Sequence, residues 1–317
     1  MLPKSLEGRL RLPILVSPMF LVSGPDLVIA SSRAGVMGSF PAFNQRTSEG
    51  YEQWLKTVRA GLDAGSAPWA AQFPVHRSNE RLETDLALTI KYEVPILIST
   101  IGITREVTDA VHAYGGLVFH DAINVRHAKK ALEANVDGII AVSGGGGGHS
   151  GTYNPFAFLG ELKPVMDGKA LILAGGMSDG QAVAGAIAAG ADLAYLGTRF
   201  INTVESIASD KLKRLVLESD ITDVVYTDAV DGMGSSFLRQ TLPGDDFRRS
   251  LAEGPQTLGE ILEPRRWIDI LSAGQGVGAI QDIPATAALV DRLEAGYYQA
   301  VSRLNAFPLT PRRAPAA

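Results

Sequence analysis

Eight short apolar runs, each followed by a loop and a segment with helical spacing, constrain the fold of this chain more than any other feature. The runs fall at residues 13–17, 35–40, 69–73, 94–99, 117–120, 138–142, 170–174 and 192–196. Helical patterns cover 25–33, 48–63, 79–92, 104–114, 125–135 and 179–190. Short strands that are apolar throughout are typical of a parallel sheet covered on both faces, and parallel neighbours need helical crossovers.

This order predicts an α/β protein with a (β/α)8 TIM barrel, and a doubly wound sheet is the alternative. The barrel is expected over residues 1–220, with the helical segment 285–304 as a candidate to complete it. After a helical stretch at 205–219 the rhythm stops, so residues 221–284 are expected to form a smaller substrate cap. Together these C-terminal parts make an appended helical cap segment. Residues 305–317 form a tail rich in proline and arginine, and we expect this tail to be disordered.

Composition narrows the class of ligand. The net charge of −5 and the lack of a basic run give no footprint for nucleic acid. No apolar run approaches the roughly 20 residues that span a bilayer, and no signal-peptide pattern opens the chain, so we expect a cytoplasmic protein away from membranes. The chain has no cysteine, and no histidine and carboxylate spacing indicates a metal site. A small molecule is the expected ligand.

The last two predicted strands end in residues suited to binding phosphate. Gly175-Gly176 follows the seventh strand and Gly197-Thr198 the eighth. In TIM barrels the reactive groups lie at the carboxyl ends of the strands, and the loops after strands seven and eight commonly hold phosphate. Backbone N–H groups and one hydroxyl favour such a site, although the glycines also suit tight turns.

A run of five glycines, residues 144–148, follows the sixth strand and leads to His149. The run contains a formal G-x-G-x-x-G, but consecutive glycines produce that match easily and no acidic partner lies at the usual distance. We interpret the run as clearance for a flat ring or a ribityl chain. His149 is the candidate acid or base, since imidazole transfers protons near neutral pH. His120 ends another strand and is either a second site residue or a structural partner of Asp121.

The ordered set of motifs resembles the nitronate monooxygenases, formerly called 2-nitropropane dioxygenases, over about residues 10–240. The residues that carry the resemblance are Pro18-Met19, Gly35-Val36-Met37-Gly38, Gly147-Gly148-His149, Ala174-Gly175-Gly176 and Leu196-Gly197-Thr198-Arg199-Phe200. The resemblance implies an FMN-dependent barrel that needs no metal, with dioxygen as the final oxidant. It further implies that the residue matching His149 is the base that acts on nitroalkanes or contacts nitronates.

The resemblance also implies where the cofactor lies. The phosphate would contact Gly175, Gly176, Gly197 and Thr198, and the ring would lie against Pro18, Met19 and Gln72, with Ser143, Gly147 and Gly148 beside it. Substrate contacts are expected at His120, Ser150, Tyr153 and Met233, under a lid at about 226–235. Asp121 stands where some relatives place a lysine near the flavin, and an anionic carboxylate there would disfavour an anionic reduced flavin.

Three alternatives stay open. The same scaffold and histidine are similar to NAD(P)H-dependent flavin reductases of quinones and of enoyl thioesters. A flavin- or phosphate-ligand-binding barrel without catalysis is the non-enzymatic alternative. The expected partners are a small-molecule substrate and dioxygen, and a homodimer is one assembly that such a barrel allows.

Overall fold

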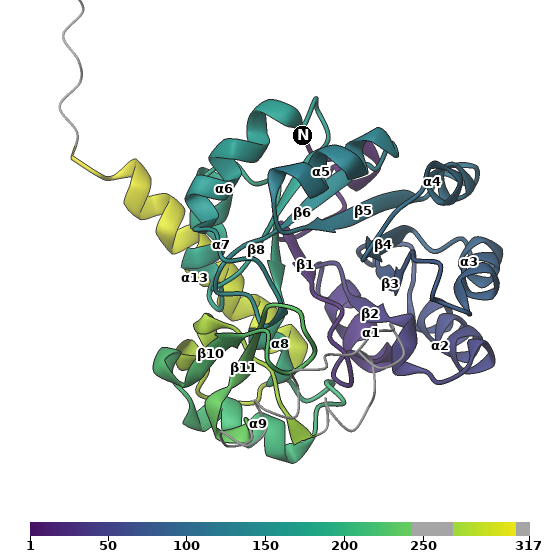
Figure 1. The fold of residues 1–317 in the computed structure, drawn as a ribbon. Helices are drawn as coiled ribbons and strands as arrows, with labels where there is room; N and C mark the ends of the chain where they lie inside the picture. The colour runs from purple at the N-terminus through teal and green to yellow at the C-terminus, as the bar shows by residue number, and fades with distance from the viewer. Residues whose placement is uncertain (243–268, 309–317) are drawn as a thin grey trace, which may run out of the picture.

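A computed structural model describes residues 1–242 and 269–308 of the chain (Figure 1). Within these residues one sheet holds eight parallel strands in the order β1-β9-β8-β6-β5-β4-β3-β2. The strands are β1 (Ile14–Val16), β2 (Ser39–Pro41), β3 (Ala70–Pro74), β4 (Ile96–Thr100), β5 (Leu117–Ala122), β6 (Gly138–Val142), β8 (Ala170–Ala174) and β9 (Leu193–Leu196). A parallel bridge between Leu15 and Met37 joins β1 to the segment before β2 and closes the sheet. The predicted (β/α)8 TIM barrel is confirmed.

Helices surround the barrel (Figure 1). They are α1 (Pro25–Arg33), α2 (Ser48–Gly61), α3 (Leu82–Lys91), α4 (Arg105–His112), α5 (Val125–Glu133), α6 (Pro155–Leu162), α7 (Gly180–Ala188), α8 (Thr198–Ile201), α9 (Asp210–Glu218) and α13 (Thr286–Asn305). Side-chain caps start several of them: the Asn124 side chain accepts from the His127 N–H at α5, and Asp179 accepts from Ala182 at α7. The helix expected from residue 205 begins only at 210, because Ser209 caps it by accepting from the Leu212 N–H.

The barrel strands are buried on both faces, which explains their apolar runs. Ile98, Phe119 and Ile140 point into the barrel and pack on one another. Their neighbours Leu97 and Val118 point outward and pack in the layer between strands and helices. Since side chains alternate along a strand, a residue two positions beyond an inward-facing one also faces inward. This alternation decides which strand-end residues reach the mouth of the barrel.

A second sheet lies over that mouth. It pairs β10 (Val224–Thr227) with β11 (Ser235–Leu238), and β11 with β7 (Gly148–His149), all antiparallel. Ser235 pairs with His149, and Ser236 pairs with Gly148. The sequence places residues 148–149 in a loop, and this interpretation is wrong in that they form a short strand. The strand depends on partners more than 80 residues later, which local patterns do not reveal.

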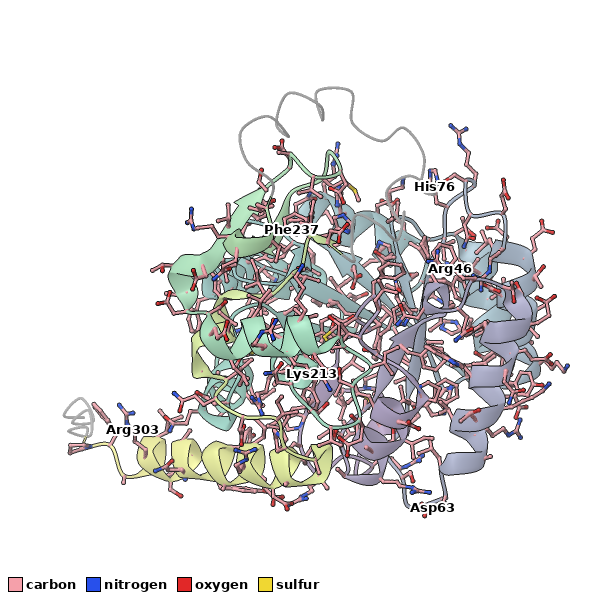
Figure 2. All side chains as sticks on the ribbon, turned by 90° about the horizontal axis from the view of Figure 1, so that it is seen from below. Arg46, Asp63, His76, Lys213, Phe237 and Arg303 are labelled. Atoms are coloured by element: carbon pink, nitrogen blue, oxygen red, sulfur yellow. The ribbon has the colours of Figure 1, made fainter. Side chains whose placement is uncertain are left out.

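Helix α13 returns to the barrel and packs along α7 (Figure 1). Arg11, just before β1, donates to Asp291 at 2.8 Å and to Glu294 on this helix. Figure 2 shows α13 running along one side of the molecule, with Arg303 near its far end. Of the tail expected to be disordered, residues 309–317 lie outside the described residues, as does the part of the expected cap at 243–268. The division into barrel, cap and tail stays a prediction.

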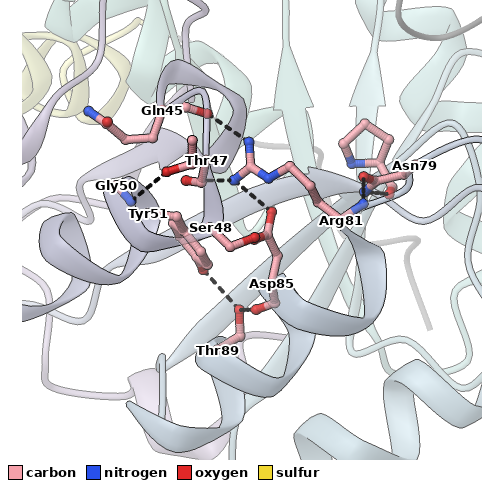
Figure 3. A network of polar contacts seen from close by, with 10 residues as sticks. Gln45, Thr47, Ser48, Gly50, Tyr51, Asn79, Arg81, Asp85 and Thr89 are labelled. Atoms are coloured by element: carbon pink, nitrogen blue, oxygen red, sulfur yellow. Dashed lines mark hydrogen bonds and ion pairs between the residues drawn. The ribbon is translucent and has the colours of Figure 1, made fainter.

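A polar network joins α2 and α3 (Figure 3). Asp85 accepts from the Ser48 hydroxyl at 2.7 Å and pairs with Arg81 at 2.9 Å. Tyr51 and Thr89 share a hydrogen bond of 2.8 Å beside them. Burial raises the pKa of Asp85, and the Ser48 and Arg81 contacts oppose that rise. The cluster joins two helices, and Arg81 also lies over the ring of Phe43, which lines the cavity at the barrel mouth.

Candidate functional site

A cavity of about 1100 Å³ lies at the carboxyl ends of the barrel strands, between them and the small second sheet. This is the end at which barrel enzymes hold their substrates, and the volume lies at the upper end of small-molecule sites. Most of the predicted site residues line it together: Pro18, Met19, Gln72, His120, Gly147, Gly148, His149, Ser150, Gly175, Gly176, Gly197, Thr198 and Met233.

Two predicted site residues lie apart from this cavity. Ser143 is fully buried, and its hydroxyl donates to the carbonyl of Ala174 at 2.6 Å. Tyr153 is 53% exposed, packs its ring against Phe158 and borders a separate hollow between α5 and α6. Ser143 therefore supports the glycine run from behind, and the structure does not bring Tyr153 to the cavity.

The floor of the cavity is a layer of inward-facing side chains from successive strands. Each lies two residues beyond a side chain of the inner core, such as Phe119 before Asp121 on β5. We call these side chains the cavity floor: Gln72, Thr100, Asp121, Val142, Ala174 and Tyr195. It combines apolar and hydrogen-bonding groups, which suits a flat heteroaromatic ligand.

Four segments meet at the expected phosphate region. Gly175 and Gly176 have φ of 126° and 70°, so both need the left-handed region that favours glycine. The carbonyl of Gly145 accepts from Gly176 at 3.1 Å and from Gln275 at 2.9 Å. The Thr198 hydroxyl accepts from the Gly274 N–H at 2.8 Å. The Gly176 N–H is thus engaged within the protein, while its open Cβ position leaves space beside the backbone.

The last of these segments, residues 274–276, was not assigned to the site from the sequence. Gly274 and Gly276 line the cavity, and a Cβ on Gly274 would stand 2.6 Å from the carbonyl of Gly145. The signal available was the alternation of glycine at 274, 276 and 278. This alternation could be assigned to the site only from the tertiary structure, which places the segment against the loops after β8 and β9.

His149 lies beside a buried carboxylate. Its Nε2 is 2.6 Å from Oδ2 of Asp231, whose side chain is only 1% exposed. The other carboxylate oxygen, Oδ1, accepts from the Met233 N–H at 3.0 Å. Gly232, with φ of 81°, turns the chain between them. The pairing of β7 with β11 therefore holds the imidazole at the cavity, and a fixed carboxylate sets its orientation.

Asp231 is the functional candidate that sequence reasoning missed. It lies 82 residues after His149, within the stretch expected to form a lid, and nothing local distinguishes it from the neighbouring Asp228. An Asp-Gly turn between two strand-forming stretches predicts a hairpin. The identity of its contact across the second sheet could come only from the tertiary structure.

His120 and Asp121 do not form the structural pair that the sequence left open. His120 Nδ1 hydrogen-bonds the Ser99 hydroxyl at 2.8 Å on the neighbouring strand. Consecutive strand residues point to opposite faces, so Asp121 faces the barrel interior instead. Burial, aided by the nearby His127, lowers the pKa of His120 to about 4, which keeps the imidazole neutral. Burial raises the pKa of Asp121 to about 7.

Solved structures share this fold. A nitroalkane oxidase from Streptomyces ansochromogenes superimposes with a TM-score of 0.81 at 24% identity, covering 95% of this chain and 99% of that one. FabK from Thermotoga maritima superimposes with a TM-score of 0.79 at 22% identity, covering 94% of this chain and 96% of that one. At these identities the likeness shows that the chain shares their TIM-barrel fold.

The family follows from sequence comparison. The nitronate monooxygenase family model matches residues 66–242, so the chain belongs to the nitronate monooxygenase family. The nitronate monooxygenase of Paraburkholderia phytofirmans is 26% identical, over 93% of this chain and 94% of that protein.

A second relative carries a different name. A (3aS,4S,5R,7aS)-5-hydroxy-7a-methyl-1-oxo-octahydro-1H-indene-4-carboxyl-CoA dehydrogenase from Rhodococcus jostii is 30% identical. The match covers 73% of this chain but only 63% of that protein.

In the described ranges, no helix has the length and apolar character needed to cross a bilayer. Among the same residues, no three histidine, aspartate or glutamate side chains gather where they could hold a metal ion.

Proposed function

We propose that this protein carries out FMN-dependent oxidative denitrification of alkyl nitronates, and of the neutral nitroalkanes from which they form, with dioxygen as oxidant and His149 as base. The observation that carries the proposal is the contact of 2.6 Å between His149 and the buried Asp231 at the edge of the cavity. A carbon acid next to a nitro group needs only a modest base, and an imidazole oriented by a carboxylate meets that need.

The residues of the cavity fit FMN. A Cβ on Gly176 would meet no atom within 4 Å, and a Cβ on Gly148 would meet only the Ser272 hydroxyl, at 3.8 Å. Both glycines therefore leave open space beside the backbone. Gly175, Gly176, Gly197 and Thr198 would hold the phosphate, and Pro18, Met19 and Gln72 would contact the ring. FMN bound there would supply the redox chemistry that carries electrons from the nitronate to dioxygen.

The protein's own contribution is proton transfer and positioning. Asp231 favours the imidazole tautomer with its proton on Nε2 and stabilises the imidazolium that forms when His149 takes the α-proton of a nitroalkane. A nitronate has already lost that proton, so it needs His149 only as a contact. The second sheet covers the cavity and limits the access of water to the reacting groups.

A thioester oxidoreductase is the second candidate. The residues that line the cavity of about 1100 Å³ include Ile101, Ile103 and Ile123 and, on α5, His127 and Lys130. This volume exceeds what a short nitroalkane needs, and the apolar and basic side chains suit a long acyl group with an anionic end. The coenzyme A ester named for the Rhodococcus jostii relative favours the same class. An NAD(P)H-dependent reductase of enoyl thioesters or quinones would use this space.

Several further expectations stay proposals. These are the small-molecule substrate and dioxygen as partners, a cytoplasmic location, a homodimer, and FMN as the particular flavin. A catalytically silent barrel would not need a histidine held by a buried carboxylate, so the pair favours an enzyme.

The decisive test is anaerobic mixing of the FMN-loaded protein with propyl-1-nitronate, with the neutral nitroalkane and with NADH, while flavin bleaching is recorded. We expect bleaching by the nitronate. His149→Ala and Asp231→Asn should keep FMN and slow the neutral nitroalkane on the order of 100-fold, with a much smaller effect on the nitronate.

The exposed Asp228→Asn, three residues before Asp231, serves as the matched control and should leave both rates unchanged. Bleaching by NADH without bleaching by nitronate would overturn the proposal in favour of a reductase. Equal losses on both substrates in the His149 and Asp231 variants would exclude the base role.

A further inference from the structure

One carboxyl group in the cavity floor has no use in the proposed reaction. Asp121 faces inward at the end of β5, two residues beyond the fully buried Phe119. Among the described residues, its Oδ1 atom is buried without a hydrogen-bond partner. An unpaired buried oxygen costs free energy, so a carboxyl group left in this state in a ligand cavity points to a contact with the ligand.

The surroundings of Asp121 do not supply a counter-charge. Thr100 on β4 favours the ionised form of Asp121 and so opposes the rise of its pKa. Tyr195 on β9 is uncharged, because burial and, next, the nearby Asp121 raise the pKa of its phenol well above the usual value. From β6, Val142 contributes only an apolar side chain to the floor. The groups that titrate or carry charge elsewhere on the cavity are His120, His127, Lys130 and His149. His120 faces the opposite side of β5 and is neutral above about pH 4.

We propose that Asp121 is a proton acceptor coupled to the flavin: when two electrons reach the ring, the Asp121 carboxylate takes up one proton from solvent. A second proton from solvent goes to the ring, which is left as a singly charged anion beside a neutral carboxylic acid. The electrons come from the nitronate in the proposed reaction, or from dithionite in a titration. This inference rests on the proposed FMN site in the same cavity.

The coupling follows from electrostatics. A carboxylate and a reduced, anionic ring within one cavity of low polarity repel each other, and protonation of the carboxyl removes the repulsion. The pKa of Asp121, about 7 in the protein without ligand, means that the carboxyl loses its proton near neutral pH and can regain it on reduction. Between that pKa and the higher value that reduction imposes, electron uptake carries an additional proton.

The test compares the wild type with Asp121→Asn, both loaded with FMN, by dithionite titration against reference dyes and by FMN binding in both redox states. At about pH 9 we expect the ratio of the dissociation constants of oxidised to reduced FMN to be tenfold or more higher in Asp121→Asn than in the wild type. At about pH 6, where the wild-type carboxyl is already protonated, the two ratios should agree. Asp109→Asn, which changes an exposed carboxylate on α4, and His127→Gln, which removes a neighbouring titratable group, should keep the wild-type pH dependence.

Parallel curves for the wild type and Asp121→Asn from about pH 6 to about pH 9 would overturn the proposal. Redox difference infrared spectroscopy of the wild type gives a second readout that needs no variant. A carboxylic acid band should appear on reduction at about pH 8, and its absence would also overturn the proposal. Neither measurement uses a nitronate, so failure of nitronate oxidation and failure of this coupling are separate results.

Discussion

His120 and Asp121 are consecutive residues on β5, yet burial moves their pKa values in opposite directions. The imidazole falls to about 4 and the carboxyl rises to about 7, because burial penalises the charged form of each group. The two side chains lie on opposite faces of the strand and are desolvated separately. Their contributions to stability therefore depend on pH with opposite sign.

The variant His120→Gln tests the predicted direction of the pH dependence of stability for His120. Between about pH 6.5 and 4 the unfolded chain binds a proton at His120 that the native protein excludes, so acidification costs stability there. The free energy of unfolding of the wild type, minus that of His120→Gln, should fall by about 2 kcal/mol from pH 7 to pH 5.

For Asp121 the native state binds the extra proton, between its usual pKa and about 7. On acidification from pH 7 to pH 5, the same difference taken with Asp121→Asn should therefore rise by about 2 kcal/mol. Urea unfolding of the flavin-free protein measures both differences. A difference that does not change with pH for either variant would contradict its assignment.

Among the elements, α7 and α13 pack more closely than ordinary side chains allow. A Cβ on Gly180, the first residue of α7, would overlap the carbonyl of Leu293 and stand 2.5 Å from the Tyr297 nitrogen. Gly296 faces it from α13. The two glycines let the backbones approach, and this approach brings the last described helix against the barrel.

Gly180→Ala should therefore destabilise the protein by about 1–3 kcal/mol through overpacking. Gly185→Ala is the matched control on the same helix, since its Cβ would meet open space and alanine favours the helix by about 0.5–1 kcal/mol. Thermal unfolding distinguishes the two. Equal melting temperatures for both variants would mean that the helices separate without cost.

At the scale of the whole molecule, the candidate site joins segments that span most of the chain. The Thr198 hydroxyl after β9 accepts from Gly274, and Gly145 accepts from Gln275, so the barrel loops and the segment from the C-terminal third hold one another. A ligand at these loops should stabilise both parts together.

FMN at about 100 times its dissociation constant should raise the free energy of unfolding by about 2.7 kcal/mol in the wild type. Thr198→Val removes the hydroxyl and should weaken FMN binding by about tenfold, with a smaller rise at the same FMN concentration. Thr222→Val, which alters a surface hydroxyl bonded to Asp220, is the control. Melting curves recorded with increasing FMN measure the effect, and an unchanged response in Thr198→Val would remove this residue from the site.

Local patterns were enough for the barrel itself. The strands are apolar because both faces are buried, and the helices begin at side-chain caps that lie within a few residues of the bonds they make. The glycines after β8 and His149 after β6 were also visible, since the carboxyl ends of barrel strands meet at one mouth. The site residues gathered there, except Ser143 and Tyr153, whose side chains point elsewhere.

The sequence by itself thus determined the barrel, the family and the end of the barrel at which the cavity lies, because each depends on short-range periodicity or on ordered motifs. Only the tertiary structure decided that His149 lies on a strand, that Asp231 is its partner, and that residues 274–276 border the expected phosphate region. It also decided that Asp121 is desolvated while facing the cavity. These features depend on contacts between segments far apart in the chain and on burial, which no local window of sequence contains.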